Sequence, residues 1–276
     1  MNDDKELRPS HSPSRHSSAF TLIEMLVVIT ILGILAGLAV PALKNIGKSD
    51  SSIGASRQLL DDVGRARQKA INNHTTVYMV FVPTNFWVNF TAAEMGMPVT
   101  TNLIDKQLSG YTFVSQGAVG DQPGRHQWNY LEPWQSLPSG SFIAGQKFSE
   151  SPSQFYTNAS YNIYGFHVTT NVPPFPFPTE TNFTTQPLPY IAFNYLGQLT
   201  SEQLTPTPLG QHEYIPLAQG NVNYGIDPTT KAPQLTVVNP GDVIETPAGN
   251  STNSSYNIID IDPLTGRATL LFQKLQ

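Results

Sequence analysis

The sequence predicts an α+β protein in which one long N-terminal helix precedes a domain of antiparallel β-strands. Two observations support this class. Apolar residues dominate residues 20–43 and recur at helical spacing over residues 53–73, whereas β-branched and aromatic residues form short strand-like runs after His74. We therefore expect a helix over residues 20–73 and a β-rich globular domain over residues 74–276.

The apolar segment at residues 20–43 is long enough to span a lipid bilayer. No charged residue occurs from Met25 to Leu43, and a helix of that length covers roughly the 30 Å of a bilayer core. One carboxylate, Glu24, lies near the start of the segment. Because a charged side chain costs about 2.5–3.5 kcal/mol at the centre of a membrane, Glu24 is expected to have a partner.

The residues before this segment, 1–19, have the character of a processed leader. They are polar, contain Pro9 and Pro13, and end in a serine-rich stretch. Arg15 is the basic residue nearest to the apolar segment, which favours a cytoplasmic leader. The globular domain would then lie on the opposite side of the membrane, after a single crossing.

Three simpler interpretations of the apolar segment compete with this one. A secretory signal peptide, cleaved after Ala42, would have a shorter apolar region of about 7 to 15 residues, without a charge such as Glu24. A plain uncleaved anchor leaves Glu24 without a role. A buried helix of a soluble protein would be shorter than this run.

A short motif surrounds the lone carboxylate. Phe20-Thr21-Leu22-Ile23-Glu24 follows a small residue, Ala19, and precedes a long apolar run that contains Pro41. This motif resembles the cleavage and methylation signal of type IV pilins and type II secretion pseudopilins. The resemblance implies that a prepilin peptidase cuts between Ala19 and Phe20 and methylates the new amino group of Phe20. Glycine is usual before the cut in that family, so Ala19 departs from the pattern.

Cleavage before Phe20 would explain Glu24. The new ammonium group and the Glu24 carboxylate of an adjacent subunit can neutralise each other, so that assembly removes a membrane penalty. Gly33 and Gly37 form a small-xxx-small pattern that lets neighbouring helices approach closely, and Pro41 is expected to loosen or bend the helix. Prepilin peptidase, other pilin or pseudopilin subunits and the inner membrane are therefore the expected partners. The resemblance implies a single crossing of the inner membrane, with the globular domain on the periplasmic side or in an extracellular fibre.

The second part of the helix is predicted to be amphipathic and to pack on a sheet. A break or bend is expected at Gly47-Lys48-Ser49-Asp50, and Asn72-Asn73-His74 is expected to end the helix. Asp61 lies four residues before Arg65, a spacing suited to a surface ion pair. The apolar positions at near-helical spacing are Leu59, Leu60, Val63, Ala66, Ala70 and Ile71.

The remainder is predicted to consist of short strands and long loops. Strand-like pieces occur at residues 75–82, 86–90, 161–168, 190–195, 235–238, 258–261 and 268–272. A turn at Asp262–Gly266 is expected to join the last two strands into a hairpin. Residues 83–189 look like a large loop insertion, and the proline-rich part at 171–189 is expected to be an extended surface loop.

The junction of helix and first strand carries a further resemblance. Residues 59–81, with Ala66-Arg67 and Ala70, are similar to the corresponding part of GspH/FimT-type minor pseudopilins, as are residues 191–200 and 261–270. The resemblance implies a pilin-like fold, in which the long N-terminal helix packs on an antiparallel sheet.

Composition and missing motifs exclude several classes of function. The chain has no cysteine, 15 basic and 20 acidic residues, and few basic residues after Lys69, so nucleic acid is not an expected partner. No catalytic motif, metal-binding histidine pair or phosphate loop occurs, so we expect neither an enzyme nor a cofactor. Asp260 and Asp262, on one face of a predicted strand, are the candidates for calcium binding.

Two functions from different classes remain. The first is a structural subunit that is assembled through its N-terminal helix into a type IV pilus or a type II secretion pseudopilus. The alternative is a membrane-anchored adhesin whose proline- and aromatic-rich loops bind a ligand such as a glycan, and which does not polymerise. A third reading, DNA uptake, would need a basic patch that the chain lacks after Lys69.

Overall fold

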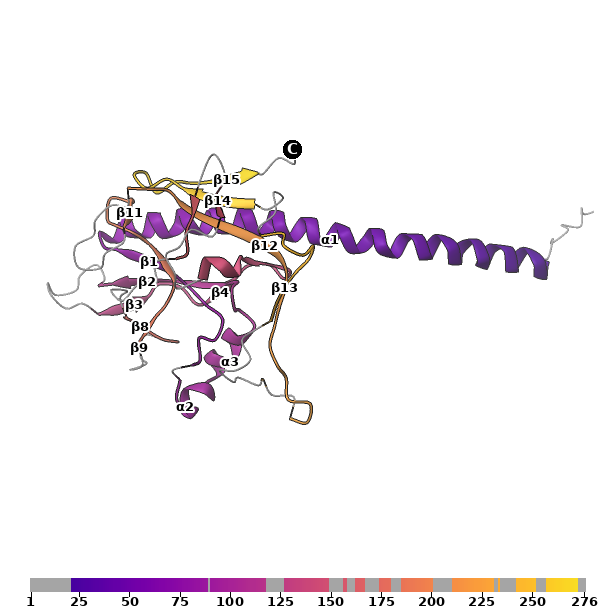
Figure 1. Ribbon diagram of the computed structural model, residues 1–276, viewed down its shortest axis with the longest axis horizontal. Helices are drawn as coiled ribbons and strands as arrows, with labels where there is room; N and C mark the ends of the chain where they lie inside the picture. The colour runs from indigo at the N-terminus through magenta and orange to yellow at the C-terminus, as the bar shows by residue number, and fades with distance from the viewer. Residues whose placement is uncertain are drawn as a thin grey trace, which may run out of the picture. The chain divides into compact units, whose positions relative to one another are not determined.

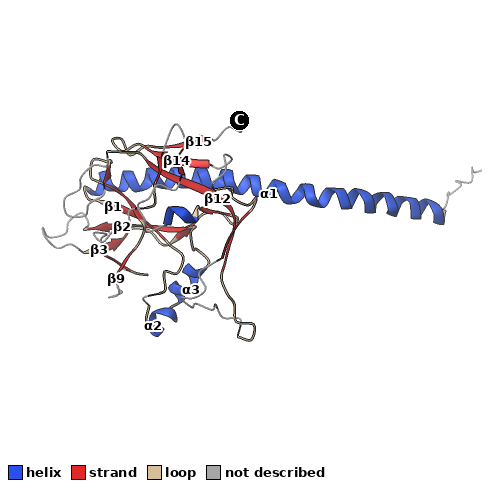
Figure 2. Cartoon of the chain, in the orientation of Figure 1, coloured by secondary structure: helices blue, strands red, loops and turns tan. Residues whose placement is uncertain are grey.

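The structure is a computed structural model, and it divides into two units, Met1–Gly47 and Lys48–Gln276, hereafter the N-terminal unit and the globular unit. It describes residues 21–88, 90–117, 127–148, 156–157, 162–166, 174–179, 185–200, 210–230, 233, 242–251 and 257–272. Side chains at 38–50, 92, 156–157, 162 and 272 are not described. The arrangement of elements is drawn in Figure 1 and by type in Figure 2.

The predicted long helix is present as α1, which runs from Leu22 to Asn73. A break or bend is predicted at Gly47–Asp50. The break is wrong, because α1 continues without interruption through these residues and through Pro41, and the bend stays a prediction. A glycine costs only about 1 kcal/mol in a helix, and helix propagation from both sides offsets this cost. The predicted end is confirmed, since His74 adopts a left-handed conformation with φ 50° just after Asn73.

The larger sheet of the globular unit has six strands. Five follow the spatial order β11-β10-β1-β2-β3, β4 also pairs with β2, and all pairs are antiparallel. The strands are β1 (Val77–Phe81), β2 (Gly110–Gln116), β3 (Trp128–Tyr130), β4 (Gln135–Ser136), β10 (Tyr190–Phe193) and β11 (Leu199–Thr200). The predictions of strands near 75–82 and 190–195 are thereby confirmed.

A second antiparallel sheet has the order β13-β12-β14-β15, with β5 also paired to β12. Its strands are β5 (Ser141–Ile143), β12 (Glu213–Asn223), β13 (Asp242–Glu245), β14 (Asn257–Ile261) and β15 (Ala268–Phe272). The predicted C-terminal hairpin is confirmed, because β14 and β15 pair from Asn257↔Phe272 to Ile261↔Ala268. The strand expected at 235–238 lies outside the described residues.

The remaining elements are short. They are α2 (Ala92–Met95), α3 (Pro98–Ile104), the 3₁₀ turn η1 (Gly145–Phe148), and two ribbons made of β6 (Tyr156–Thr157) with β7 (Asn162–Ile163) and β8 (Pro174–Pro176) with β9 (Thr185–Pro187). Within the described part of 161–168, only Asn162–Ile163 is strand, so the strand predicted there is much shorter than expected.

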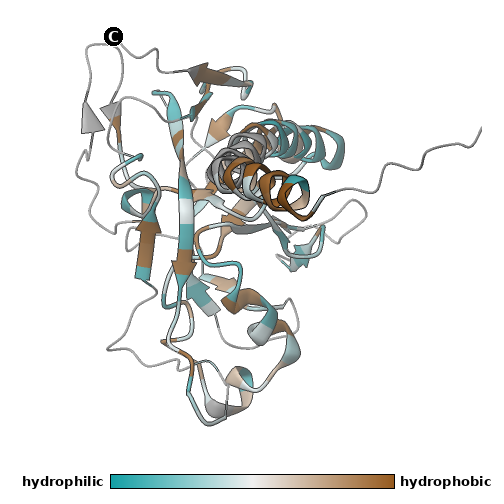
Figure 3. Cartoon of the chain, turned by 90° about the vertical axis from the view of Figure 1, so that its right-hand side faces the viewer, coloured by the Kyte–Doolittle hydropathy of each residue, from teal (hydrophilic) through white to brown (hydrophobic). Residues whose placement is uncertain are grey.

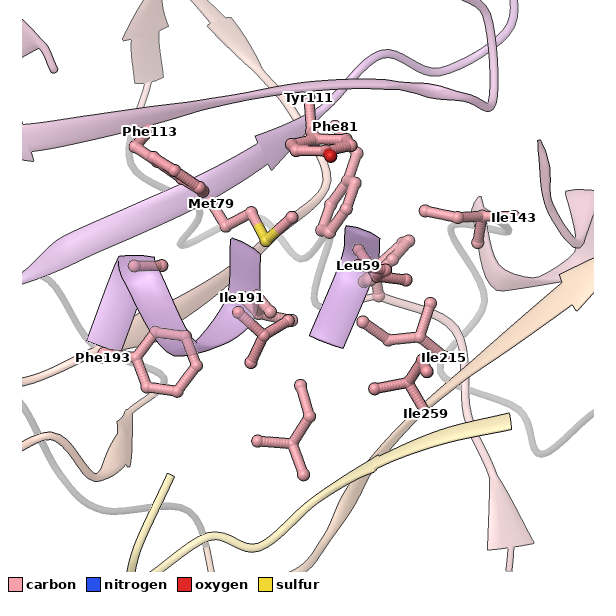
Figure 4. Packing of buried hydrophobic residues seen from close by; sticks show 14 of the residues in the cluster. Leu59, Met79, Phe81, Tyr111, Phe113, Ile143, Ile191, Phe193, Ile215 and Ile259 are labelled. Atoms are coloured by element: carbon pink, nitrogen blue, oxygen red, sulfur yellow. The ribbon is translucent and has the colours of Figure 1, made fainter. Parts of the chain in front are cut away.

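Both faces of β1 are buried, so the globular unit has one apolar cluster on each side of this strand. Val77, Met79 and Phe81 join a core with α1 and the second sheet, in which Leu59 lies near Ile215, as Figure 4 shows. The helix contributes one stripe to this core, as its apolar spacing predicts. The stripe comprises Ala55, Leu59, Val63, Ala66 and Ala70, all fully buried, whereas Leu60 and Ile71 are only half-buried.

The opposite face of β1 is covered by aromatic side chains from the stretch that was expected to be a loop insertion. Phe86, Trp87, Phe175 and Phe177 are buried in this second cluster with Tyr78 of β1. Residues 83–189 therefore do more than form loops: they also contain β2, which pairs on both sides.

Two local predictions inside this stretch are wrong. The strand predicted at 86–90 is a turn in its described residues, because Asn85 takes φ 60° and Phe86 and Trp87 fill the aromatic cluster instead of pairing. The surface loop predicted at 171–189 contains the β8–β9 ribbon, and Phe175 in β8 and Phe177 just after it are buried. Proline is tolerated in this two-stranded ribbon because each strand has a free edge. Burial of the phenylalanine side chains stabilises the ribbon.

Candidate functional site

The described part of the apolar segment, Thr21 to Gly37, is exposed on every side. Figure 3 shows these turns of α1 mostly in the brown of hydrophobic residues. Eleven large apolar side chains are between 46% and 84% exposed, namely Leu22, Ile23, Met25, Leu26, Val27, Val28, Ile29, Ile31, Leu32, Ile34 and Leu35. A helix that is hydrophobic all round belongs in a protein or lipid environment. We call residues 21–37 the apolar helix segment.

Glu24 lies in the first turn of α1 and closes a capping box with Thr21. The Thr21 backbone N–H and hydroxyl both donate to Glu24 Oε2, at 2.9 Å each, and the Glu24 N–H donates to Thr21 Oγ1 at 3.3 Å. The carboxylate thus satisfies helix donors and opposes the positive end of the helix dipole. The sequence signal for this cap, Thr-x-x-Glu, was present but was missed in the sequence analysis.

Each polar side chain of the apolar helix segment has a hydrogen-bond partner in the segment itself. Besides the Thr21–Glu24 cap, the Thr30 hydroxyl donates to the carbonyl of Leu26 at 2.7 Å. Apart from these three residues, the segment contains only apolar residues and glycine. The hydroxyls of Thr21 and Thr30 therefore need no water, and the Glu24 carboxylate is the one charged group of the segment.

Gly33 and Gly37 lie on one face of this segment, four residues apart. A Cβ atom added at either glycine would meet no atom within 4 Å. Their small size is therefore not required by contacts within the described chain, and it leaves room for the close approach of another helix. Pro41 is within α1, but its side chain lies outside the described part, as do the predicted cleavage residues Ala19 and Phe20.

The calcium candidates form a small polar cluster at the C-terminal hairpin. The Asp260 carboxylate accepts a hydrogen bond from Nδ1 of His212 at 2.7 Å, and the Asp262 carboxylate accepts bonds from Thr265 and Leu264 within the turn. Among the described residues, no group of three or more acidic, histidine or cysteine side chains is placed to hold a metal ion. The hydrogen bonds of the Asp262 carboxylate lie within the turn itself.

Comparison with known proteins bears on the N-terminal segment. Residues 14–40 match the family model of the prokaryotic N-terminal methylation motif. This match covers Ala19, Phe20, Glu24, Gly33 and Gly37, and it supports the relation to pilins and pseudopilins. Searches of curated proteins and of solved structures gave no match. Within the described part of the chain, no helix reaches the length and mean hydropathy needed to cross a membrane.

Proposed function

We propose that this chain is a structural subunit that a prepilin peptidase cleaves between Ala19 and Phe20 and methylates at Phe20. Its N-terminal helix then assembles with those of other subunits into a type IV pilus or a type II secretion pseudopilus. The observation that carries the proposal is the coincidence of the methylation motif with a helix that is apolar and exposed on all sides. The chain would act as a building block and not as an enzyme.

Exposure of the apolar helix segment to water would be costly, so the segment needs lipid or neighbouring helices around it. Burial of one large aliphatic side chain is worth about 1.5–3 kcal/mol relative to exposure to water, and eleven such side chains are exposed here. Before assembly, the inner membrane would shelter them over residues 20–43, with the globular unit on the periplasmic side. In the fibre, neighbouring helices would take the place of lipid, and Gly33 and Gly37 would permit their close contact.

The fold of the globular unit supports a pilin-like architecture. Residues 53–73 of α1 place one apolar stripe against an antiparallel sheet, which is the arrangement implied by the resemblance to GspH/FimT-type minor pseudopilins. The helix-to-strand junction at 59–81 lies at the centre of this packing, with β1 directly after α1. We propose that the whole chain is related to GspH/FimT-type minor pseudopilins.

Intact-mass measurement of the full-length chain tests the processing step. Co-expression with an active prepilin peptidase is expected to yield a chain that begins at methylated Phe20, and co-expression with an inactive peptidase the uncleaved chain. The variant Ala19→Gly, which restores the usual residue before the cut, is expected to be processed at least as fast. A mature chain that begins at Leu43 would identify a secreted protein and overturn the proposal.

Disulfide cross-linking tests assembly, because the chain contains no cysteine of its own. The variant Ile29→Cys places a thiol on the apolar helix segment, and the control Leu264→Cys places one on the exposed turn of the C-terminal hairpin. Oxidation of membranes from cells that carry the secretion machinery should give cross-linked oligomers for Ile29→Cys and few for Leu264→Cys. Equal cross-linking of both variants would argue against specific helix packing.

A further inference from the structure

We propose that the globular unit contains a binding site for an uncharged oligosaccharide, in a cleft bounded by α3, β3 and β4. The cleft has a volume of about 860 Å³, which is large enough for several sugar rings. Leu103 of α3 and Pro178 contribute buried apolar surface, and Tyr130 and Trp134 contribute half-buried aromatic rings. This inference does not depend on fibre assembly.

The two aromatic rings are held in place by their polar ends. The Trp134 indole N–H donates to the carbonyl of Pro178 at 3.0 Å, and the Tyr130 hydroxyl donates to the carbonyl of Pro176 at 2.6 Å. The ring centroids lie 6.0 Å apart, and Trp134 packs edge-on against Phe177 at 5.5 Å. Rings that are fixed in this way offer apolar surface at little cost in side-chain entropy.

A smaller polar cavity continues the cleft on one side. It has a volume of about 270 Å³, and it shares Asp105, Ser136 and Ser139 with the larger cleft. Its remaining lining includes Gln107, Asn221 and further hydroxyl and amide groups. The combined site thus has an aromatic part and a part rich in hydrogen-bonding groups.

Gln107 supplies an acceptor that lacks a partner in the described part of the chain. This side chain is 2% exposed, and its Nε2 donates to the carbonyl of Ile104 at 2.9 Å, but its Oε1 accepts no hydrogen bond. Leaving a buried acceptor unsatisfied costs about 1–3 kcal/mol. Gln107 also lines the smaller cavity, so its amide belongs to the polar part of the site.

Charges of both signs border the cleft, so its lining does not favour a ligand charge of one sign. Glu132 pairs with Lys69 at 3.0 Å and lies 3.5 Å from Arg65. Asp105 accepts a hydrogen bond of 2.5 Å from Tyr224 and is followed by Lys106, which also lines the cleft. A sugar ring has a face of C–H groups, which suits fixed aromatic rings, and a rim of hydroxyls, which suits amides and serines. A polyanion or a polycation would match this lining of mixed charge less well than a neutral sugar.

The test uses the full chain in lauryldimethylamine oxide, because detergents with sugar head groups would compete for the cleft. An array of neutral and acidic oligosaccharides is probed first, and neutral glycans that bind are then titrated by isothermal calorimetry. We expect binding of neutral glycans in preference to acidic ones. If no neutral glycan binds at millimolar concentration, or if only charged ligands bind, the proposal is wrong.

Three variants locate the binding site. Trp134→Ala removes the aromatic surface, and Asn102→Trp fills the cleft from an exposed position on α3, so it can block binding without loss of core contacts. Each is expected to weaken binding at least tenfold. Tyr195→Ala removes an aromatic residue that is 52% exposed and does not line the cleft, and it should bind as the unmodified chain does. Unchanged affinity of a folded Asn102→Trp variant would overturn the assignment.

Discussion

The buried carboxylate of Asp62 accepts a hydrogen bond from the hydroxyl of Tyr111, and this contact joins α1 to β2. Gln58 donates to the same hydroxyl at 2.7 Å, and Arg65 donates to the other oxygen of Asp62. Burial, and then the bond to Asp62, raise the pKa of Tyr111 well above its usual value, so the hydroxyl stays a donor. A polar contact thus fixes the helix over the sheet within an otherwise apolar interface.

We predict that Asp62→Ala lowers the free energy of unfolding of the globular unit by about 1–3 kcal/mol, since it leaves the Tyr111 hydroxyl without its acceptor. The matched control is Asp61→Ala, one residue earlier and exposed, which should change stability by less than about 0.5 kcal/mol. Urea denaturation of both variants measures the difference. Equal effects would mean that the helix charge, and not the buried contact, is responsible.

Two turns of the globular unit approach each other closely at Gly266 and Gly197. Gly266 has φ 60°, and a Cβ atom added there would lie 2.0 Å from the carbonyl oxygen of Gly197. Gly266→Ala should therefore lower the free energy of unfolding by about 2–4 kcal/mol. Gly64→Ala, in the exposed part of α1 with no atom within 4 Å of the new Cβ, should raise it by about 0.5–1 kcal/mol. Thermal unfolding of the two variants checks both signs.

The sequence predicted those features that depend on local patterns. The apolar stripe from Leu59 to Ala70, the helix end at Asn73 and the hairpin of β14 and β15 follow from residue spacing and turn chemistry, and all three are present. The motif around Glu24 was also recognisable, because cleavage signals are read by a peptidase as contiguous sequence.

Features that depend on distant residues were not predictable in this way. The buried role of Asp62 requires Tyr111, and the expected Asp61–Arg65 surface pair is replaced because Arg65 turns to Asp62, three residues before it. Likewise, the aromatic residues of 83–189 were read as loop, since nothing local to Phe86 or Phe177 shows that they cover the far face of β1. Three separate stretches of chain line the aromatic cleft, so no single sequence motif could predict it.

The hairpin turn should be sensitive to acid. Hydrogen bonds from the backbone and side chain of Thr265, and from Leu264, hold the pKa of Asp262 below its usual value, with a further contribution from His212. Since the pKa is lower in the folded state, this stabilisation is present above the ordinary aspartate pKa and is lost as the pH falls through the lowered value. Amide NMR signals of Thr265 should shift over that acid range. In Asp262→Asn, which keeps an acceptor but does not titrate, the shift should be absent; the same acid response in both proteins would contradict this role.

The final prediction separates the two roles that Glu24 can have in the apolar helix segment. Within the chain, Glu24 caps the helix through Thr21; in a fibre, the same carboxylate would neutralise the ammonium group of Phe20 on an adjacent subunit. Glu24→Ala removes both interactions, whereas Thr21→Ala removes only the hydroxyl of the cap and keeps the charge. If pairing between subunits drives assembly, Glu24→Ala should reduce cross-linking through Ile29→Cys at least tenfold, which corresponds to about 1.4 kcal/mol or more. Thr21→Ala should then retain most of the cross-linking.

The opposite outcome would be an equal loss of cross-linking in the two variants. Because a capping box contributes about 1 kcal/mol to helix stability, equal losses would show that capping alone accounts for Glu24 and that the intersubunit pair is not formed.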